Sequence, residues 1–242
     1  MLDPRTHALL ARADDALVLG HRLSEWCGRA PMPEEDLALA NLALDQIGLA
    51  RALYAEVGAR TGQTEDDLAY FRTDREFRNV LLVEQPNGDF AHTIARQFLY
   101  TAHADNFWRA ATASKDQAFA AVAAKAEKES AYHLRHASEW LIRLGDGTAE
   151  SHARAQAALE ALWPYTAELS EPDPPETLLP DPAPLRAAWS ATVDRVLARA
   201  TLARPADGWA QSGGRRGLHS EAFGKMLAEM QSLARAHPGA VW

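Results

Sequence analysis

The carboxylates and histidines of this 242-residue chain are the side chains that could bind metal ions. A helical bundle with a di-iron centre takes a Glu-x-x-His pair from each of two helices and one Glu from each of the other two. That pattern occurs nowhere in the sequence. The segments best placed to carry the pairs have Asp45 with Gly48, and Ser130 with His133, so one lacks the imidazole and the other lacks the carboxylate. We interpret these four residues as degenerate ligand positions.

Three further observations bear on a metal site in the chain. Asp14, Asp15 and Asp45 lie in otherwise apolar helical segments, and a buried carboxylate needs a cationic or protonated partner. The apolar surroundings of Asp45 favour burial, with a solvated helix face as the alternative for all three. Asp14 or Asp15, together with Asp45 and His133, would leave two iron ions with too few ligands and too little negative charge. We therefore expect no metal, catalytic or cofactor-binding residues in this chain.

Two pairs have ligand-like spacing without a complete site. Glu129 and His133 are four residues apart and share a helix face, so they could ligate one metal ion, but a helix surface of charge pairs and capping histidines explains them better. Asp89 and His92 lie where a helix should begin, and there an aspartate is better explained as the N-cap.

The loop from Gly208 to Gly217 is the other distinctive stretch, because it combines glycines with paired arginines. Glycine permits positive φ, and arginine can grip a carboxylate or a phosphate. We interpret Arg215, Arg216, His219 and Glu221 as a partner-contact loop or a contact for an anionic nucleotide tail. An ordinary mobile surface loop is the alternative.

The elements that must position these residues are helices, because apolar residues recur at helical spacing. Four long helices are predicted over about 9–26, 34–58, 90–113 and 117–144. The connection over 63–88 is less periodic and could contain a crossover, and the secondary structure of Val80–Val83 stays open.

Further helices are predicted over 150–169, 185–202 and 220–236, with a proline-rich break between 171 and 184. The prediction is an all-α protein in a single domain over residues 1–242. Its four-helix core spans 1–147, and additional C-terminal helices with the proline-rich linker span 148–242.

Composition excludes several classes of protein. A net charge of −8 argues against non-specific nucleic-acid binding. Cys27 is the single cysteine, so no internal disulfide forms, and beside Trp26 it is interpreted as a small buried apolar residue. No apolar run is long enough to predict a membrane span, and the N-terminus lacks a signal-peptide pattern, so a cytoplasmic location is expected.

A family resemblance is carried by six segments, of which the stretch Leu81–Gly88 is the most specific. The other segments are 25–28, 36–41, 132–135, 217–219 and 226–231. These segments resemble the C-subunit family of the multicomponent phenylacetyl-CoA ring-1,2-epoxidase, and the resemblance runs over nearly the whole chain.

The resemblance implies a ferritin-like four-helix bundle and a place in aerobic phenylacetate catabolism. In this family the A subunit holds the di-iron centre and binds the acyl-CoA, and a reductase supplies electrons from NADPH. The C subunit pairs with A and lacks a working metal site. We therefore expect a non-catalytic structural subunit, with the A subunit and the other subunits of the complex as partners and no cofactor of its own.

Two alternatives remain open from the residues alone. One is a free-standing metal-binding ferritin-like enzyme that uses Glu129, His133 and Asp45. The other is a CoA-binding regulatory module that acts through Arg215 and Arg216. A structural subunit should instead show an apolar stripe on its second or third helix that stays exposed when the chain is alone.

Overall fold

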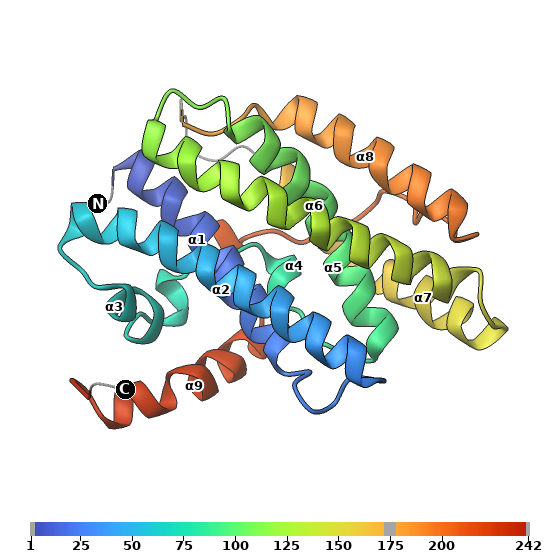
Figure 1. Ribbon diagram of the computed structural model, residues 1–242, viewed down its shortest axis with the longest axis horizontal. Coiled ribbons are helices and arrows are strands. Elements are labelled where there is room, and N and C mark those ends of the chain that lie inside the picture. Colours follow the sequence, from blue (N-terminus) through green and yellow to red (C-terminus); the bar gives the residue numbers. More distant parts are fainter. Residues whose placement is uncertain (1–2, 172–177, 241–242) are drawn as a thin grey trace. The chain divides into compact units, whose positions relative to one another are not determined.

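The computed structural model describes residues 3–171 and 178–240, and within them the chain is helical without any strand. The all-α prediction is confirmed, and the long helices agree with the ferritin-like fold that the resemblance implies. The elements, labelled in Figure 1, are α1 (Pro4–Ser24), α2 (Pro33–Thr61), α3 (Glu65–Tyr70), η1 (Asp74–Glu76), α4 (Leu81–Glu84), α5 (Phe90–Ala111), α6 (Gln117–Gly145), α7 (Ala149–Leu162), η2 (Trp163–Tyr165), η3 (Ala167–Ser170), α8 (Pro182–Arg199), η4 (Gly214–Arg216) and α9 (Glu221–Ala236).

The four long helices begin and end at local signals. The side chain of Asp89 accepts a hydrogen bond from the backbone N–H of His92, which confirms Asp89 as the N-cap of α5. Asp116 caps α6 in the same way through the N–H of Phe119. Gly62 ends α2 with a left-handed φ of 76°, a conformation that glycine adopts without steric cost. These ends depend on neighbouring residues only, and the sequence places them to within a few positions.

One stretch that the sequence left open is helical, and another differs from the prediction. The segment 63–88 forms the short helices α3, η1 and α4, so Leu81–Glu84 is a single helical turn. The helix predicted to reach Leu169 ends at Leu162 and continues as the 3₁₀ turns η2 and η3. Pro164 explains the early end, because proline lacks the N–H that a helix interior needs and its ring clashes with the preceding turn.

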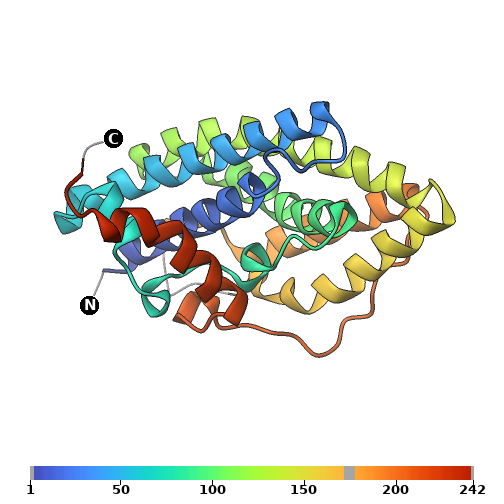
Figure 2. The same cartoon turned by 90° about the horizontal axis from the view of Figure 1, so that it is seen from below.

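The described residues group into two compact units, one from 3–86 with 212–240 and the other from 87–171 with 178–211. The first unit contains both ends of the described chain, because α9 packs against α3 and η1. Figure 2 shows the last helix in red, beside these early elements. The four-helix core over 1–147 with additional helices over 148–242 stays a prediction. The single domain over 1–242 stays a prediction.

In the first unit, α1 packs along α2. Gly20 makes the close approach of the two helices feasible, since a Cβ there would lie 2.9 Å from Cγ1 of Ile47 and 3.2 Å from the carbonyl oxygen of Ala43. In the second unit, α5 packs along α6 and also contacts α7 and α8. The indole N–H of Trp189 donates to the carbonyl of Leu99 at 3.0 Å, which ties α8 to α5.

No helix in residues 3–171 and 178–240 combines the length and the apolar character that a membrane crossing requires.

Candidate functional site

Asp14 is the most deeply buried carboxylate of α1, with no exposed surface. It accepts hydrogen bonds from the hydroxyl of Tyr54 at 2.6 Å, from Nη1 of Arg72 at 3.0 Å and from the backbone N–H of Arg78 at 2.7 Å. Burial by itself lowers the pKa of Arg72, but the charges of Asp14 and Tyr54 and the hydrogen bond to Asp14 together raise that pKa above its ordinary value. Asp14 is therefore a structural anion whose charge is balanced inside the first unit.

Asp15 is also buried, and its partner comes from the far end of the chain. Arg215 reaches it with both terminal nitrogens, Nη1 at 2.9 Å from Oδ1 and Nη2 at 2.7 Å from Oδ2. The backbone N–H of Val80 adds a bond of 2.8 Å. Of the two interpretations open for Asp14 and Asp15, burial with a cationic partner is the correct one.

Glu84 is a third buried carboxylate, which the sequence reasoning did not single out. It accepts from the side-chain amide of Asn79 at 2.9 Å and from the backbone N–H of Ser220 at 2.7 Å, and its Oε2 lies 2.7 Å from Nδ1 of His219. It belongs to the Leu81–Gly88 stretch that carried the family resemblance, which was the one available signal.

His219 bridges two acceptors, because its Nε2 lies 3.1 Å from the carbonyl oxygen of Phe77 while its Nδ1 faces Glu84. Both ring nitrogens can donate only in the protonated imidazolium. Burial by itself lowers the pKa of His219, but the hydrogen bond and charge of Glu84 outweigh it, so the pKa rises above 6.5.

The second half of the loop, which carries Arg215, is closely packed, and this argues against an ordinary mobile loop there. Gly213 and Gly217 have φ of 137° and 75°, and a Cβ on Gly214 would overlap the carbonyl of Asn79. Arg215 and His219 are bonded within the first unit.

The other two residues of the predicted partner-contact loop are exposed. Glu221 forms a surface ion pair with Lys225 at 2.6 Å, and Arg216 lies on the η4 turn. Partner contact stays a prediction for Arg216 and Glu221.

The degenerate ligand positions differ in burial. Ser130 and His133 are buried on α6, whereas Asp45 and Gly48 are only half-buried on α2. No group of three or more His, Cys, Asp or Glu that could hold a metal ion occurs in residues 3–171 and 178–240. With Asp14 and Asp15 bonded to arginines as well, the residues present do not fit a di-iron centre.

Two residues that were expected to be buried, Asp45 and Cys27, are not buried in the structure. The prediction that Asp45 is buried is wrong, because part of the apolar surface around it faces outward. Cys27 is exposed rather than buried. Oε1 of Glu129 lies 3.3 Å from Nζ of Lys125. This ion pair is the charge pair on a helix surface that was the alternative to a metal ligand.

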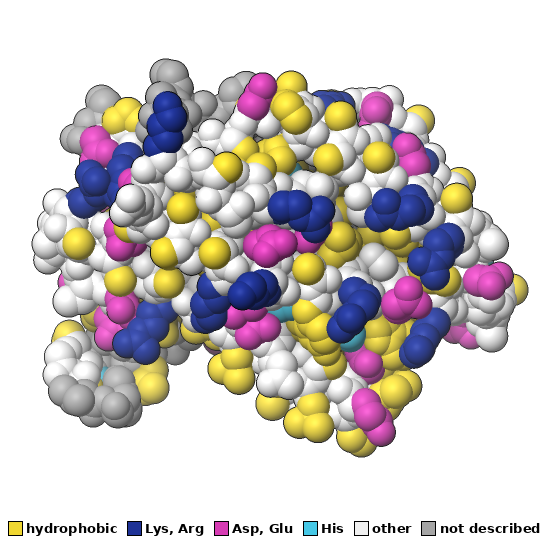
Figure 3. Space-filling view, turned by 45° about the horizontal axis from the view of Figure 1, so that its top comes forward, with side chains coloured by type: hydrophobic (Ala, Val, Ile, Leu, Met, Phe, Trp, Pro, Cys, Tyr) yellow, Lys and Arg dark blue, Asp and Glu magenta, His cyan; other side chains and the backbone are white. Residues whose placement is uncertain are grey.

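One side of α2, called here the α2 face, carries apolar residues in the open. Leu37 is 69% exposed and Leu44 is 66% exposed, and they lie two turns apart. On the view in Figure 3, hydrophobic side chains are interspersed with charged ones, and scattered apolar residues of that kind are ordinary. The α2 face differs from such scattered residues, because its members follow one another at helical spacing along one side of α2. Its members are Leu37, Asn41, Leu44, Gly48, Arg51, Ala55 and Ala59.

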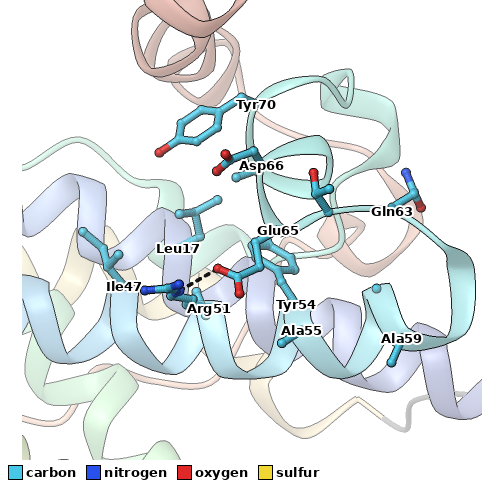
Figure 4. Close-up of a pocket in the computed structure, with 14 residues that line it drawn as sticks. Leu17, Ile47, Arg51, Tyr54, Ala55, Ala59, Gln63, Glu65, Asp66 and Tyr70 are labelled. Atoms are coloured by element: carbon cyan, nitrogen blue, oxygen red, sulfur yellow. Dashed lines mark hydrogen bonds and ion pairs between the residues drawn. The ribbon is translucent and has the colours of Figure 1, made fainter. Parts of the chain in front are cut away.

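A pocket of about 720 Å³, called here the α2–α3 pocket, adjoins the α2 face. Figure 4 shows Asp66 and Tyr70 on its α3 side and Arg51 on its α2 side, with Arg51 paired to Glu65 at 2.7 Å. Burial and the charge of Asp66 raise the pKa of Tyr70. Sequence reasoning missed this pocket because α3 was not predicted.

These features define a class: an all-helical protein whose buried carboxylates are neutralised by its own cations, and whose second helix exposes an apolar face. The sequence profile of the family described as Phenylacetic acid catabolic protein matches residues 2–242, and the chain belongs to this family. It is 47% identical over 240 residues to the C subunit of 1,2-phenylacetyl-CoA epoxidase from Escherichia coli (strain K12), and the match covers 96% of this chain and 97% of that protein. The predicted family resemblance is confirmed.

Proposed function

We propose that this chain is a non-catalytic structural subunit of a 1,2-phenylacetyl-CoA epoxidase and pairs with the di-iron A subunit in aerobic phenylacetate catabolism. The near full-length similarity to the C subunit of such an epoxidase supports the assignment to a complex of this kind. The internal chemistry of the chain supports the non-catalytic role, and the α2 face supports the pairing.

The state of the buried carboxylates carries the first part of the proposal. An iron ligand must offer its oxygen atoms to the metal, but those of Asp14 and Asp15 already accept bonds from Arg72 and Arg215. Releasing either carboxylate would leave a buried guanidinium without its counter-charge, which is strongly unfavourable. The charges in the first unit therefore stabilise the fold and are not available for oxygen activation.

The α2 face supports the second part. A stable interface between subunits buries on the order of 2,000 Å² or more, and its core is apolar. Leu37 and Leu44 are large apolar side chains that remain exposed in the chain alone. A helix of the A subunit lying along α2 would cover both leucines and would meet little steric resistance at Gly48, where a Cβ would contact nothing within 4 Å.

Co-purification with the A subunit tests the pairing. Leu44→Glu places a charge in the centre of the α2 face and should weaken the complex at least about tenfold. Leu233→Glu is the matched control, because Leu233 is a leucine of α9 with a similar exposure of 55%. Wild-type binding by Leu44→Glu would refute the assignment of the α2 face.

Metal analysis and an activity assay test the non-catalytic role. The A subunit should carry the iron, and the epoxidation rate should depend on this chain without any metal bound to it. About two irons per chain in the purified lone protein would contradict the proposal.

The CoA-binding alternative has less support. It needs both arginines of the loop, and the guanidinium of Arg215 is bonded to Asp15. Titration of the lone chain with phenylacetyl-CoA should show no binding.

A further inference from the structure

We infer that the α2–α3 pocket is a socket for a basic side chain, arginine or lysine, of the partner helix that docks on the α2 face. This inference rests on the proposed function and adds the chemistry of the contact. The pocket and the α2 face share Arg51, Ala55 and Ala59, so a helix that covers the face also passes the opening of the pocket.

The dimensions are consistent with one continuous contact. Leu44 and Ala55 are 11 positions apart on α2, which places them about 16 Å apart at the helical rise of about 1.5 Å per residue. Leu37 lies 18 positions before Ala55, so a partner helix of about five turns would reach Leu37, Leu44 and the pocket. At about 720 Å³ the pocket can hold a long side chain together with parts of its neighbours.

The walls of the pocket are apolar in depth and anionic at the rim. Leu17 and Ala69 are buried beneath it, and they suit the aliphatic stem of a lysine or arginine. The rim carries Glu65, Asp66 and one cation, Arg51. Because Arg51 is paired with Glu65, the carboxylate of Asp66 remains without a cation in the part of the chain that the structure describes.

The position of Asp66 makes this negative charge effective inside the pocket. Asp66 lies in the first turn of α3, next to Glu65, and its charge contributes to the raised pKa of Tyr70, which lies beside it on the α3 side of the pocket. A cation placed between Asp66 and Tyr70 would gain a carboxylate partner and an aromatic ring. The phosphates of a coenzyme A molecule would instead meet two carboxylates. The negative charge at the rim of the pocket therefore favours a basic occupant.

The test measures binding of the purified A subunit to variants of this chain at low and high salt. Asp66→Asn should weaken the complex about tenfold at low salt and should flatten its salt dependence, because the contact is a charge pair. Asp146→Asn is the matched control, since it makes the same change of charge at an exposed aspartate of the other unit and should leave binding unchanged.

A second variant keeps the test independent of the stability of α3. Ala55→Arg adds a cation at an exposed helical position on the edge of the pocket. That arginine can pair with Asp66 from within the chain and should compete with the partner, so binding should again fall about tenfold. Circular dichroism confirms that both variants are folded.

The outcomes separate the two proposals. Weakening by Leu44→Glu together with wild-type binding and salt dependence in Asp66→Asn and Ala55→Arg would overturn the socket and leave the docking face standing. Wild-type binding by Leu44→Glu, or no complex with the A subunit at all, would overturn both.

Discussion

Replacing Asp14 with asparagine should destabilise the protein severely, because it removes the charge that compensates Arg72. Asp14 is fully buried and the side chain of Arg72 is 6% exposed, so neither group can turn to water. The asparagine amide would also point a donor at groups that are themselves donors, the hydroxyl of Tyr54, the guanidinium and the N–H of Arg78.

The expected loss follows from this geometry. Removing one partner of a buried ion pair costs about 3–5 kcal/mol, because the other charge is left without compensation. For a chain of this size each kcal/mol lowers the melting temperature by about 2–4 °C, so a decrease of about 6–20 °C is expected. Since whole domains are stable by only about 5–15 kcal/mol, the variant should lie close to its folding limit.

Calorimetry and urea unfolding of the wild type, Asp14→Asn and Asp146→Asn measure this effect. The exposed Asp146 should change the free energy of unfolding by less than about 0.5 kcal/mol. The double variant Asp14→Asn with Arg72→Met should recover part of the loss, because it removes the orphaned charge as well. A loss below about 1 kcal/mol in Asp14→Asn, or no recovery in the double variant, would refute the account of a structural ion pair.

Two further predictions concern His219 and the glycines of α1 and α2. His219 has a folded-state pKa raised above 6.5, so its stabilising effect should be complete below pH 6.5 and should disappear as the pH rises through the raised pKa. His219→Gln should abolish this part of the pH dependence in urea titrations, and an unchanged profile would contradict it. Gly48→Ala should stabilise the fold by about 1 kcal/mol, because the added Cβ meets open space in a helix interior. Gly20→Ala should destabilise it by about 1–2 kcal/mol, because its Cβ would press on Ile47. A Gly20→Ala variant at least as stable as the wild type would show that the approach of α1 to α2 is not tight.

The pH range over which protonation changes the stability of the fold distinguishes His219 from His21 and His92. Burial lowers the pKa of His21 and of His92 below 6.5, so these two destabilise the fold as the pH falls below 6.5. His219 acts above 6.5, with the opposite sign of pKa shift. The difference between the wild type and His219→Gln above pH 6.5 therefore reports on His219.

The sequence by itself determined the helical class, most helix ends and the family. Caps such as Asp89 and Asp116 act within three residues along the chain, and the apolar periodicity repeats every turn, so both are visible without a tertiary structure. The missing Glu-x-x-His pattern is also a local property, which is why the doubt about a metal site arose from the sequence.

Only the tertiary structure decided which polar groups meet and which apolar groups stay outside. Asp14 and Arg72 are 58 positions apart and Asp15 and Arg215 are 200 apart, and no periodicity relates such partners. Arg215, predicted to face a partner, therefore turned inward. Leu37 and Leu44 stayed outward and Asp45 only half-buried, in a helix that looks central by composition. Burial depends on what packs against a surface, and helical spacing specifies the surface of one helix but not its neighbour.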